Sequence, residues 1–137
     1  MHTVKQITTL RSRLFSVTLG VALLLASQLL GADAIVKSQP FKGPKANTGH
    51  VTLAREDGKL VLTLSADFET PDTPDPHWQV VDSKGTVFLL QRIAIKENKM
   101  NRKIVLPAYV KDVAKVVIWC AWAESNLGEA VFDSPAM

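Results

Sequence analysis

Apolar residues alternate with a period of two along the clearest segments of this chain, and turn-forming residues separate these segments. Leu60, Leu62 and Leu64 alternate with their neighbours, whereas the stretch 116–122 is almost wholly apolar. A period of two is typical of a pleated strand with one buried face. Turn signals recur every 8–12 residues, which is typical of sandwiches and barrels. The pattern predicts an all-β fold, a single small β-sandwich of about seven or eight strands.

The same pattern predicts where the strands lie. The expected strands are 50–54, 60–68, 77–81, 86–95, 104–106, 116–122 and 130–132. Glu56-Asp57-Gly58 and Asp82-Ser83-Lys84-Gly85 are expected to be turns. Residues 110–113 are expected to form a helical turn or a loop. Three prolines between residues 71 and 76 exclude the interior of a central strand, so this segment is expected to be a rigid exposed loop.

The first 34 residues are expected to be a secretory signal peptide, residues 1–34. Basic residues precede an apolar run over 14–26, and Ala32-Asp33-Ala34 then provides a cleavage site with small residues. The run is shorter than the about 20 residues of a membrane-spanning helix, so no span is expected after cleavage. This predicts an exported protein, periplasmic or secreted. The alternative is an uncleaved N-terminal anchor.

Composition bounds the rest of the chain. The segment 35–48 contains Pro40, Gly43 and Pro44 and is expected to be a flexible lead-in to a domain over 49–134. The 137-residue chain has a formal net charge of +3, which falls to about +1 without residues 1–34. Such a weak field disfavours nucleic acid as a partner. A domain of about 100 residues can bury one modest core and fold alone.

Cys120 is the only cysteine, which excludes an internal disulfide and zinc sites built from CxxC pairs. Three roles stay open: a core residue, a bridge between Cys120 residues of two chains in a homodimer, or a reactive or ligating thiol. Free cysteines are among the most buried residue types, which favours the first role. A reactive thiol needs a lowered pKa. Strand alternation places Cys120 with Ile118 and Trp122 on one face, and Trp119 on the other.

His50, His77 and Met100 supply, with Cys120, the ligand types of a blue-copper site. Copper is nevertheless disfavoured, because such sites gather the Cys, a His and the Met in one loop and no His follows Cys120. The alternative is that both histidines are turn or surface residues.

Asp72 and Asp75 flank Pro74 and are expected to form local backbone hydrogen bonds in a turn, rather than an acid–base pair or a calcium site. No nucleophile motif or phosphate-binding loop is present. A stand-alone enzyme is therefore less favoured than an electron-transfer or binding module.

The chain resembles the DM13 domain family between Gly49 and Phe132. The resemblance is carried by Gly49-His50-Val51, by Pro74-Asp75-Pro76-His77-Trp78, by Val117-Ile118-Trp119-Cys120, and by Gly128-Glu129-Ala130. It implies a small extracytoplasmic β-sandwich that takes part in electron transfer. The family's signature Cys falls on Cys120, which is then a naked thiol or the ligand of a prosthetic group such as haem. Members of the family carry aromatic residues where this chain has Ala123 and Leu127.

Two functions follow as hypotheses. In the first, Cys120 is the centre of a redox module with an unknown redox partner. Trp119 and Trp122 then form its apolar shell, and His77 and His50 are further candidates for contacting a cofactor. The two versions need opposite environments, and a deeply buried Cys120 with no cavity beside it would refute both the thiol and the haem version of this module. In the second, the domain is a non-catalytic binding or adhesion module that uses the loops 69–76 and 96–103, and Cys120 is structural.

Overall fold

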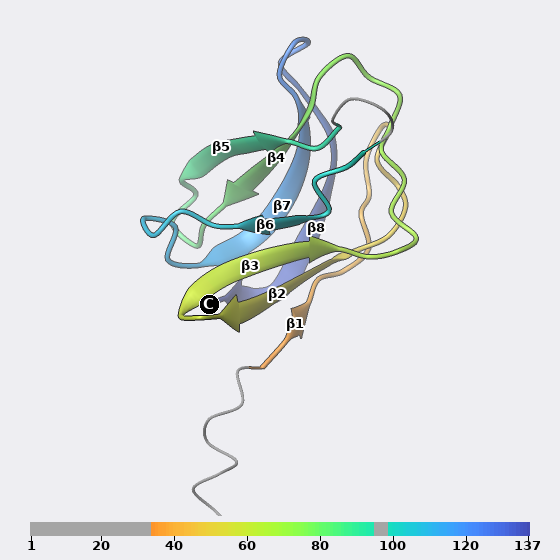
Figure 1. Ribbon diagram of the computed structural model, residues 1–137. Coiled ribbons are helices and arrows are strands. Elements are labelled where there is room, and N and C mark those ends of the chain that lie inside the picture. Colours follow the sequence, from red (N-terminus) through yellow and green to blue (C-terminus); the bar gives the residue numbers. More distant parts are fainter. Residues whose placement is uncertain (1–33, 95–98) are drawn as a thin grey trace, which may run out of the picture. The chain divides into compact units, whose positions relative to one another are not determined.

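The computed structural model describes residues 34–94 and 99–137, and within them the fold is all-β (Figure 1). Eight strands are present: β1 (Val36–Lys37), β2 (Val51–Glu56), β3 (Lys59–Leu64), β4 (Pro76–Val81), β5 (Val87–Arg92), β6 (Lys103–Val105), β7 (Val113–Cys120) and β8 (Ser125–Ala136). The expected signal peptide, apart from Ala34, and residues 95–98 of the 86–95 strand and the 96–103 loop lie outside the described residues. No helix able to cross a membrane occurs in the described ranges.

The strands form two four-stranded antiparallel sheets that face each other. Sheet A has the order β1-β2-β3-β6, and sheet B has the order β5-β4-β7-β8. The chain passes between the sheets after β3, after β5 and after β6 (Figure 1). The predicted all-β sandwich is therefore confirmed, and β7, which contains most of the almost wholly apolar stretch 116–122, is an interior strand of sheet B.

The core lies between the two sheets and is built by strand alternation. In β2, Val51 and Leu53 are buried, while Thr52 and Ala54, which alternate with them, are partly exposed. In sheet B, Trp78 on β4 lies opposite Ile118 on β7, and both are fully buried. The indole N–H of Trp78 donates to the carbonyl of Asn101 at 2.8 Å. This bond removes the cost of burying an unpaired indole donor.

The predicted turns are confirmed. Asp57 and Gly58 join β2 to β3 with φ angles of 48° and 73°, the left-handed pair that a two-residue type I′ hairpin requires. After β4, the Asp82 carboxylate accepts hydrogen bonds from the backbone amides of Lys84 and Thr86 at 3.0 and 2.8 Å. Such a side-chain cap is why Asp is favoured at the start of a turn.

The segment 35–48 is part of the sandwich, so its description as a lead-in is wrong. Phe41 and Ala46 are 1% exposed, and Phe41 packs on Phe68 with ring centroids 5.2 Å apart. The segment also hydrogen-bonds to both sheets, with Ser38 N donating to Val51 O of β2 and Ala46 N donating to Leu127 O of β8. The sequence did not predict this pairing because the segment contains proline and glycine, and neither residue type is favoured in a strand.

Other boundaries differ from the sequence-based expectation. β8 begins at Ser125 and reaches Ala136, far beyond the expected 130–132, because pairing with β7 extends it through polar residues. β3 ends at Leu64 instead of reaching toward Phe68. Residues 107–110 form a turn in which Val110 N donates to Pro107 O, and Val113 already belongs to β7.

Candidate functional site

Cys120 is the last residue of β7 and faces the core. It lies opposite Pro76 of β4 on one side and Ser125 of β8 on the other. Its side chain has no exposed surface, although the strand ends here and two connecting segments meet around it. The 121–124 turn leads from β7 into β8, and the 71–75 loop leads into β4. Cys120 therefore lies at the margin of the core, under two connections.

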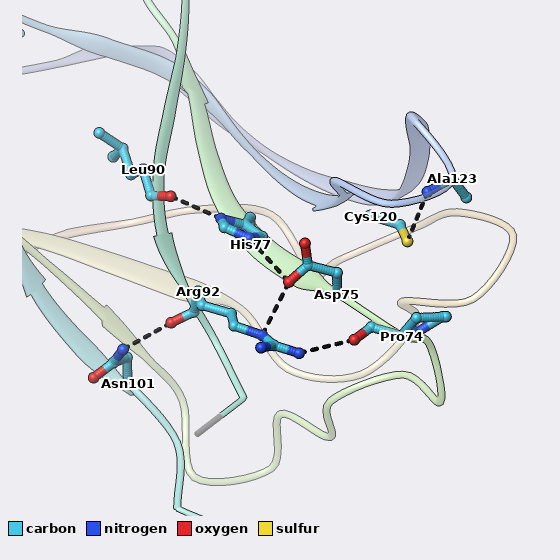
Figure 2. A network of polar contacts seen from close by, with 8 residues as sticks. All are labelled: Pro74, Asp75, His77, Leu90, Arg92, Asn101, Cys120 and Ala123. Atoms are coloured by element: carbon cyan, nitrogen blue, oxygen red, sulfur yellow. Dashed lines mark hydrogen bonds and ion pairs between the residues drawn. The ribbon is translucent and has the colours of Figure 1, made fainter. Parts of the chain in front are cut away.

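The 121–124 turn folds back on the sulfur. Glu124 has a φ of 51°, a left-handed conformation that lets the chain reverse within four residues. The reversal brings the backbone N–H of Ala123 to 3.4 Å from Cys120 Sγ (Figure 2). The backbone amide of Trp122 also helps to lower the pKa of the Cys120 thiol. A turn of backbone donors around one atom is the arrangement by which proteins hold an anion.

The 71–75 loop supplies donors from the other side. The Thr73 hydroxyl and then the Ala123 amide are the main causes that lower the pKa of the Cys120 thiol below its ordinary 9.0. Burial acts in the opposite direction but is outweighed, and the amides of Asp75 and Trp122 lower the pKa further. Hydrogen bonds to the charged form favour that form. The surroundings of Cys120 thus stabilise a thiolate, which is the nucleophilic form of cysteine.

Asp75 links this loop to the outer face of sheet B. Its backbone carbonyl accepts the Ala121 amide at 3.0 Å, which ties the loop to the 121–124 turn. Its carboxylate oxygen Oδ1 lies 3.1 Å from His77 Nε2 and 2.9 Å from Arg92 Nε (Figure 2). Arg92 also donates to the carbonyl of Pro74 at 2.9 Å. One carboxylate and one guanidinium therefore fix the position of the loop that touches the thiol.

His77 has an acceptor at each ring nitrogen. Nδ1 lies 2.9 Å from the Leu90 carbonyl, and Nε2 faces the Asp75 carboxylate. A neutral imidazole carries one N–H and satisfies one of these contacts, whereas the imidazolium donates to both. His77 is half-buried, so its ring also holds β5 and the 71–75 loop against the end of β4.

The structure brings only part of the predicted site together. Trp119 lies opposite His77 in the sheet, on the face of β7 away from Cys120. Trp122 is 76% exposed, because β7 ends at Cys120 and the alternation does not continue into the turn. The predicted apolar shell of Trp119 and Trp122 is therefore wrong. His50 immediately precedes β2 of sheet A, and its amide donates to Ser65 Oγ. His77 lies on β4, in the other sheet.

The described residues do not form a haem or copper site. No water-sized space touches the Cys120 side chain, so a planar haem does not fit beside the sulfur. Within residues 34–94 and 99–137, no three His, Cys, Asp or Glu side chains gather as metal ligands. The burial of the sulfur gives no support to a Cys120 bridge between two chains, one of the three roles that the sequence leaves open.

Sequence reasoning missed Thr73, Arg92 and the Ala123 amide. The single available signal was the spacing of Asp75 and His77 on either side of Pro76, at the start of an expected strand. Asp75 was expected to bond the local backbone, and instead its carboxylate pairs with side chains of β4 and β5. Comparisons of the chain with protein-family models, curated proteins and solved structures gave no match. The resemblance to the DM13 family therefore stands on the residues quoted above.

Proposed function

We propose that this protein is a DM13-like redox module that acts through a naked, gated thiol at Cys120. The observation that carries the proposal is the hydrogen bond from the Ala123 amide to Cys120 Sγ at 3.4 Å, beside the 71–75 loop. The lowered pKa of the thiol, to which Thr73 and then Ala123 contribute most, supports it. A purely structural cysteine needs no such donors. The resemblance to the DM13 family supports the same assignment.

The proposed chemistry is thiol–disulfide exchange with a small or protein disulfide as oxidant. The Cys120 thiolate attacks one sulfur of the disulfide R–S–S–R′, the S–S bond breaks, and R′–S⁻ leaves with the electron pair. Cys120 is then held as a mixed disulfide with R. A second thiolate attacks this bond, forms R–S–S–R″ and returns Cys120 to the thiolate. The chain has no second cysteine, so the resolving thiol must come from the partner.

The complete burial of Cys120 contradicts a permanently exposed thiol. The proposal therefore depends on a local opening of the structure that exposes the sulfur. We infer that the 71–75 loop is the segment that moves away from Cys120 in this opening. Its polar contacts join the Asp75 carbonyl to Ala121, the Asp75 carboxylate to Arg92 and His77, the Pro74 carbonyl to Arg92, and the Asp72 carbonyl to Lys45. All of these residues are at least partly exposed. Segments with few buried contacts open at low free-energy cost. We infer that the loop exposes Cys120 transiently without unfolding of the core.

We also propose that the domain acts outside the cytoplasm, in the periplasm or after secretion. The basic and apolar N-terminal pattern of residues 1–34 supports this location. Disulfides form and persist in oxidising compartments, so the oxidant class required by the exchange is present there.

The test is reaction of the folded full chain with glutathione disulfide, followed by intact-mass spectrometry. We expect one glutathionyl group per chain, absent from Cys120→Ser and removed by dithiothreitol. The rate should rise with pH and reach its plateau below the ordinary cysteine pKa of 9.0, since the thiolate is the reacting form. Urea-unfolded protein serves as the control for full thiol access. A rate no faster than that of global unfolding would refute the redox proposal.

The second candidate is a non-catalytic extracytoplasmic binding or adhesion module with a structural Cys120. It is favoured by one observation, the complete burial of the side chain within the hydrophobic core. In that case Cys120→Ala changes stability alone. A partner captured equally by the wild-type protein and by Cys120→Ala would support this candidate.

A further inference from the structure

A cationic groove lies where the β2–β3 hairpin meets the segment that follows β6. Its volume is about 560 Å³, within the range of small-molecule sites. Three positively charged residues line it, Arg55, Lys59 and Lys111, over an apolar floor that includes Leu60, Val105 and Leu106. None of these residues belongs to the Cys120 site, and none of the described residues that line the groove carries a carboxylate.

The three cations have no carboxylate partners among residues 34–94 and 99–137. Glu56, the nearest acidic residue along β2, is paired with Lys103 at 2.9 Å. The guanidinium of Arg55 donates to the Gly58 carbonyl at 3.1 Å, which holds it beside the groove and leaves other N–H groups free. Like charges gathered in a concave site raise the local positive potential.

The apolar floor adds a second requirement for the ligand. Leu60 and Leu106 are buried side chains that border the groove, and Val105 is 48% exposed at the edge strand of sheet A. The hydrated apolar surface of the groove therefore belongs mainly to Val105, with Pro107 and Ala108 beside it. Water on this surface is released when an apolar group covers it. A bare inorganic anion satisfies the cations but covers none of this surface.

We propose that the groove binds a small soluble amphiphile, namely a phosphate, sulfate or carboxylate group joined to a short alkyl chain. The anionic group contacts Lys59, Lys111 and the free N–H groups of Arg55, and the alkyl chain lies on Val105, Pro107 and Ala108. The proposal is independent of the redox function, because it uses neither Cys120 nor the 71–75 loop.

The test is a titration of the ¹⁵N-labelled full chain with octyl phosphate, followed by NMR chemical shifts. We expect saturable shifts of the groove residues at concentrations of about 1 mM or below. Lys59→Gln and Lys111→Gln should each weaken binding about two- to fivefold, the effect of losing one exposed ionic contact. The exposed Lys42, which lies outside the groove, provides the matched control, and Lys42→Gln should bind like the wild-type protein.

The apolar part of the proposal has its own control. Val105→Thr should weaken octyl phosphate binding, whereas Val87→Thr, at a valine that is 55% exposed on β5, should not. Inorganic phosphate and octanol should each bind more weakly than octyl phosphate. The proposal is overturned if octyl phosphate gives no saturable shifts in the groove, if inorganic phosphate binds equally well, or if only vesicles with anionic lipid bind.

Discussion

The contacts of Arg92 with the 71–75 loop allow us to predict how much faster a reagent reaches Cys120 when these contacts are removed. The side chain of Arg92 is 54% exposed, and its partner Asp75 is 29% exposed, so their ion pair contributes about 0.2–1 kcal/mol. The hydrogen bond to the Pro74 carbonyl adds a contribution at the low end of about 0.5–1.5 kcal/mol. Loss of both in Arg92→Gln should favour loop opening by about 1 kcal/mol, which corresponds to about fivefold more open loop.

The assay is the rate at which an aromatic disulfide reagent labels Cys120 in the folded protein at constant pH. When the loop closes faster than the reagent reacts, the rate follows the open population, so Arg92→Gln should react about fivefold faster. Arg55→Gln is the matched control, because Arg55 is also exposed and bonds a single backbone carbonyl, that of Gly58. Its labelling rate should equal that of the wild-type protein.

Low concentrations of urea separate a local opening from global unfolding. A local opening exposes little surface, so the labelling rate should depend weakly on urea, whereas global unfolding gives a steep dependence. The reasoning is refuted if Arg92→Gln leaves the rate unchanged. It is also refuted if Arg55→Gln accelerates labelling equally, or if the rate follows the steep dependence.

Three further predictions concern stability. The folded state lowers the pKa of Cys120 below its ordinary value of 9.0. The thiolate therefore contributes its full stabilisation to the folded state above pH 9.0, and this stabilisation is lost as the pH falls through the pKa of the folded state. Urea titrations should therefore show the wild-type protein gaining stability over Cys120→Ala as pH rises through this window. Trp78→Ala should cost about 3–5 kcal/mol in the same assay, by opening a core cavity and unpairing the Asn101 carbonyl. Gly128→Ala should lower the melting temperature more than Gly58→Ala. A Cβ on Gly128 would lie 2.3 Å from Ala46 O, whereas a Cβ on Gly58 would meet no neighbouring atom. Gly58→Ala therefore costs only the backbone strain of its positive φ angle, about 1–2 kcal/mol.

Each of these predictions has a contrary outcome. A stability difference between wild type and Cys120→Ala that is independent of pH would mean that no thiolate is favoured in the fold. A marginal effect of Trp78→Ala would contradict its place at the centre of the core. Equal melting temperatures for the two glycine variants would contradict the close approach of the 35–48 segment to β8.

The sandwich was predictable because strand alternation and turn chemistry are local properties. Leu60, Leu62 and Leu64 alternate in the sequence, and all three are buried in β3. Asp57-Gly58 is a hairpin turn in any context that supplies two strands. The 35–48 segment was not predictable in this way, because its proline and glycine residues argue locally against a strand and its pairing with β2 and β8 is set by distant residues.

The candidate site was predictable only in its central residue. Cys120 stands out in the sequence as the one cysteine, and alternation correctly predicts that it faces the core with Ile118. Alternation also placed Trp122 beside it, and this failed because β7 ends at Cys120 and the chain turns. Neither Thr73 nor Arg92 is marked by a motif in the sequence. Arg92 reaches the site through the register of β4 with β5, in which it lies opposite His77, and Thr73 reaches it through the loop that precedes β4.

The sequence by itself determined that this chain is an all-β sandwich with one inward-facing cysteine, because burial of one strand face and the φ angles of turns depend on neighbouring residues. Tertiary structure alone decided what surrounds that cysteine. The groups that act on the sulfur come from the 71–75 loop and the 121–124 turn, in which Thr73 and Ala123 are 50 residues apart in the chain. A hydrogen bond forms only where folding brings its two groups within bonding distance. The cationic groove has the same origin, since Arg55 and Lys111 meet only after the sheets have assembled.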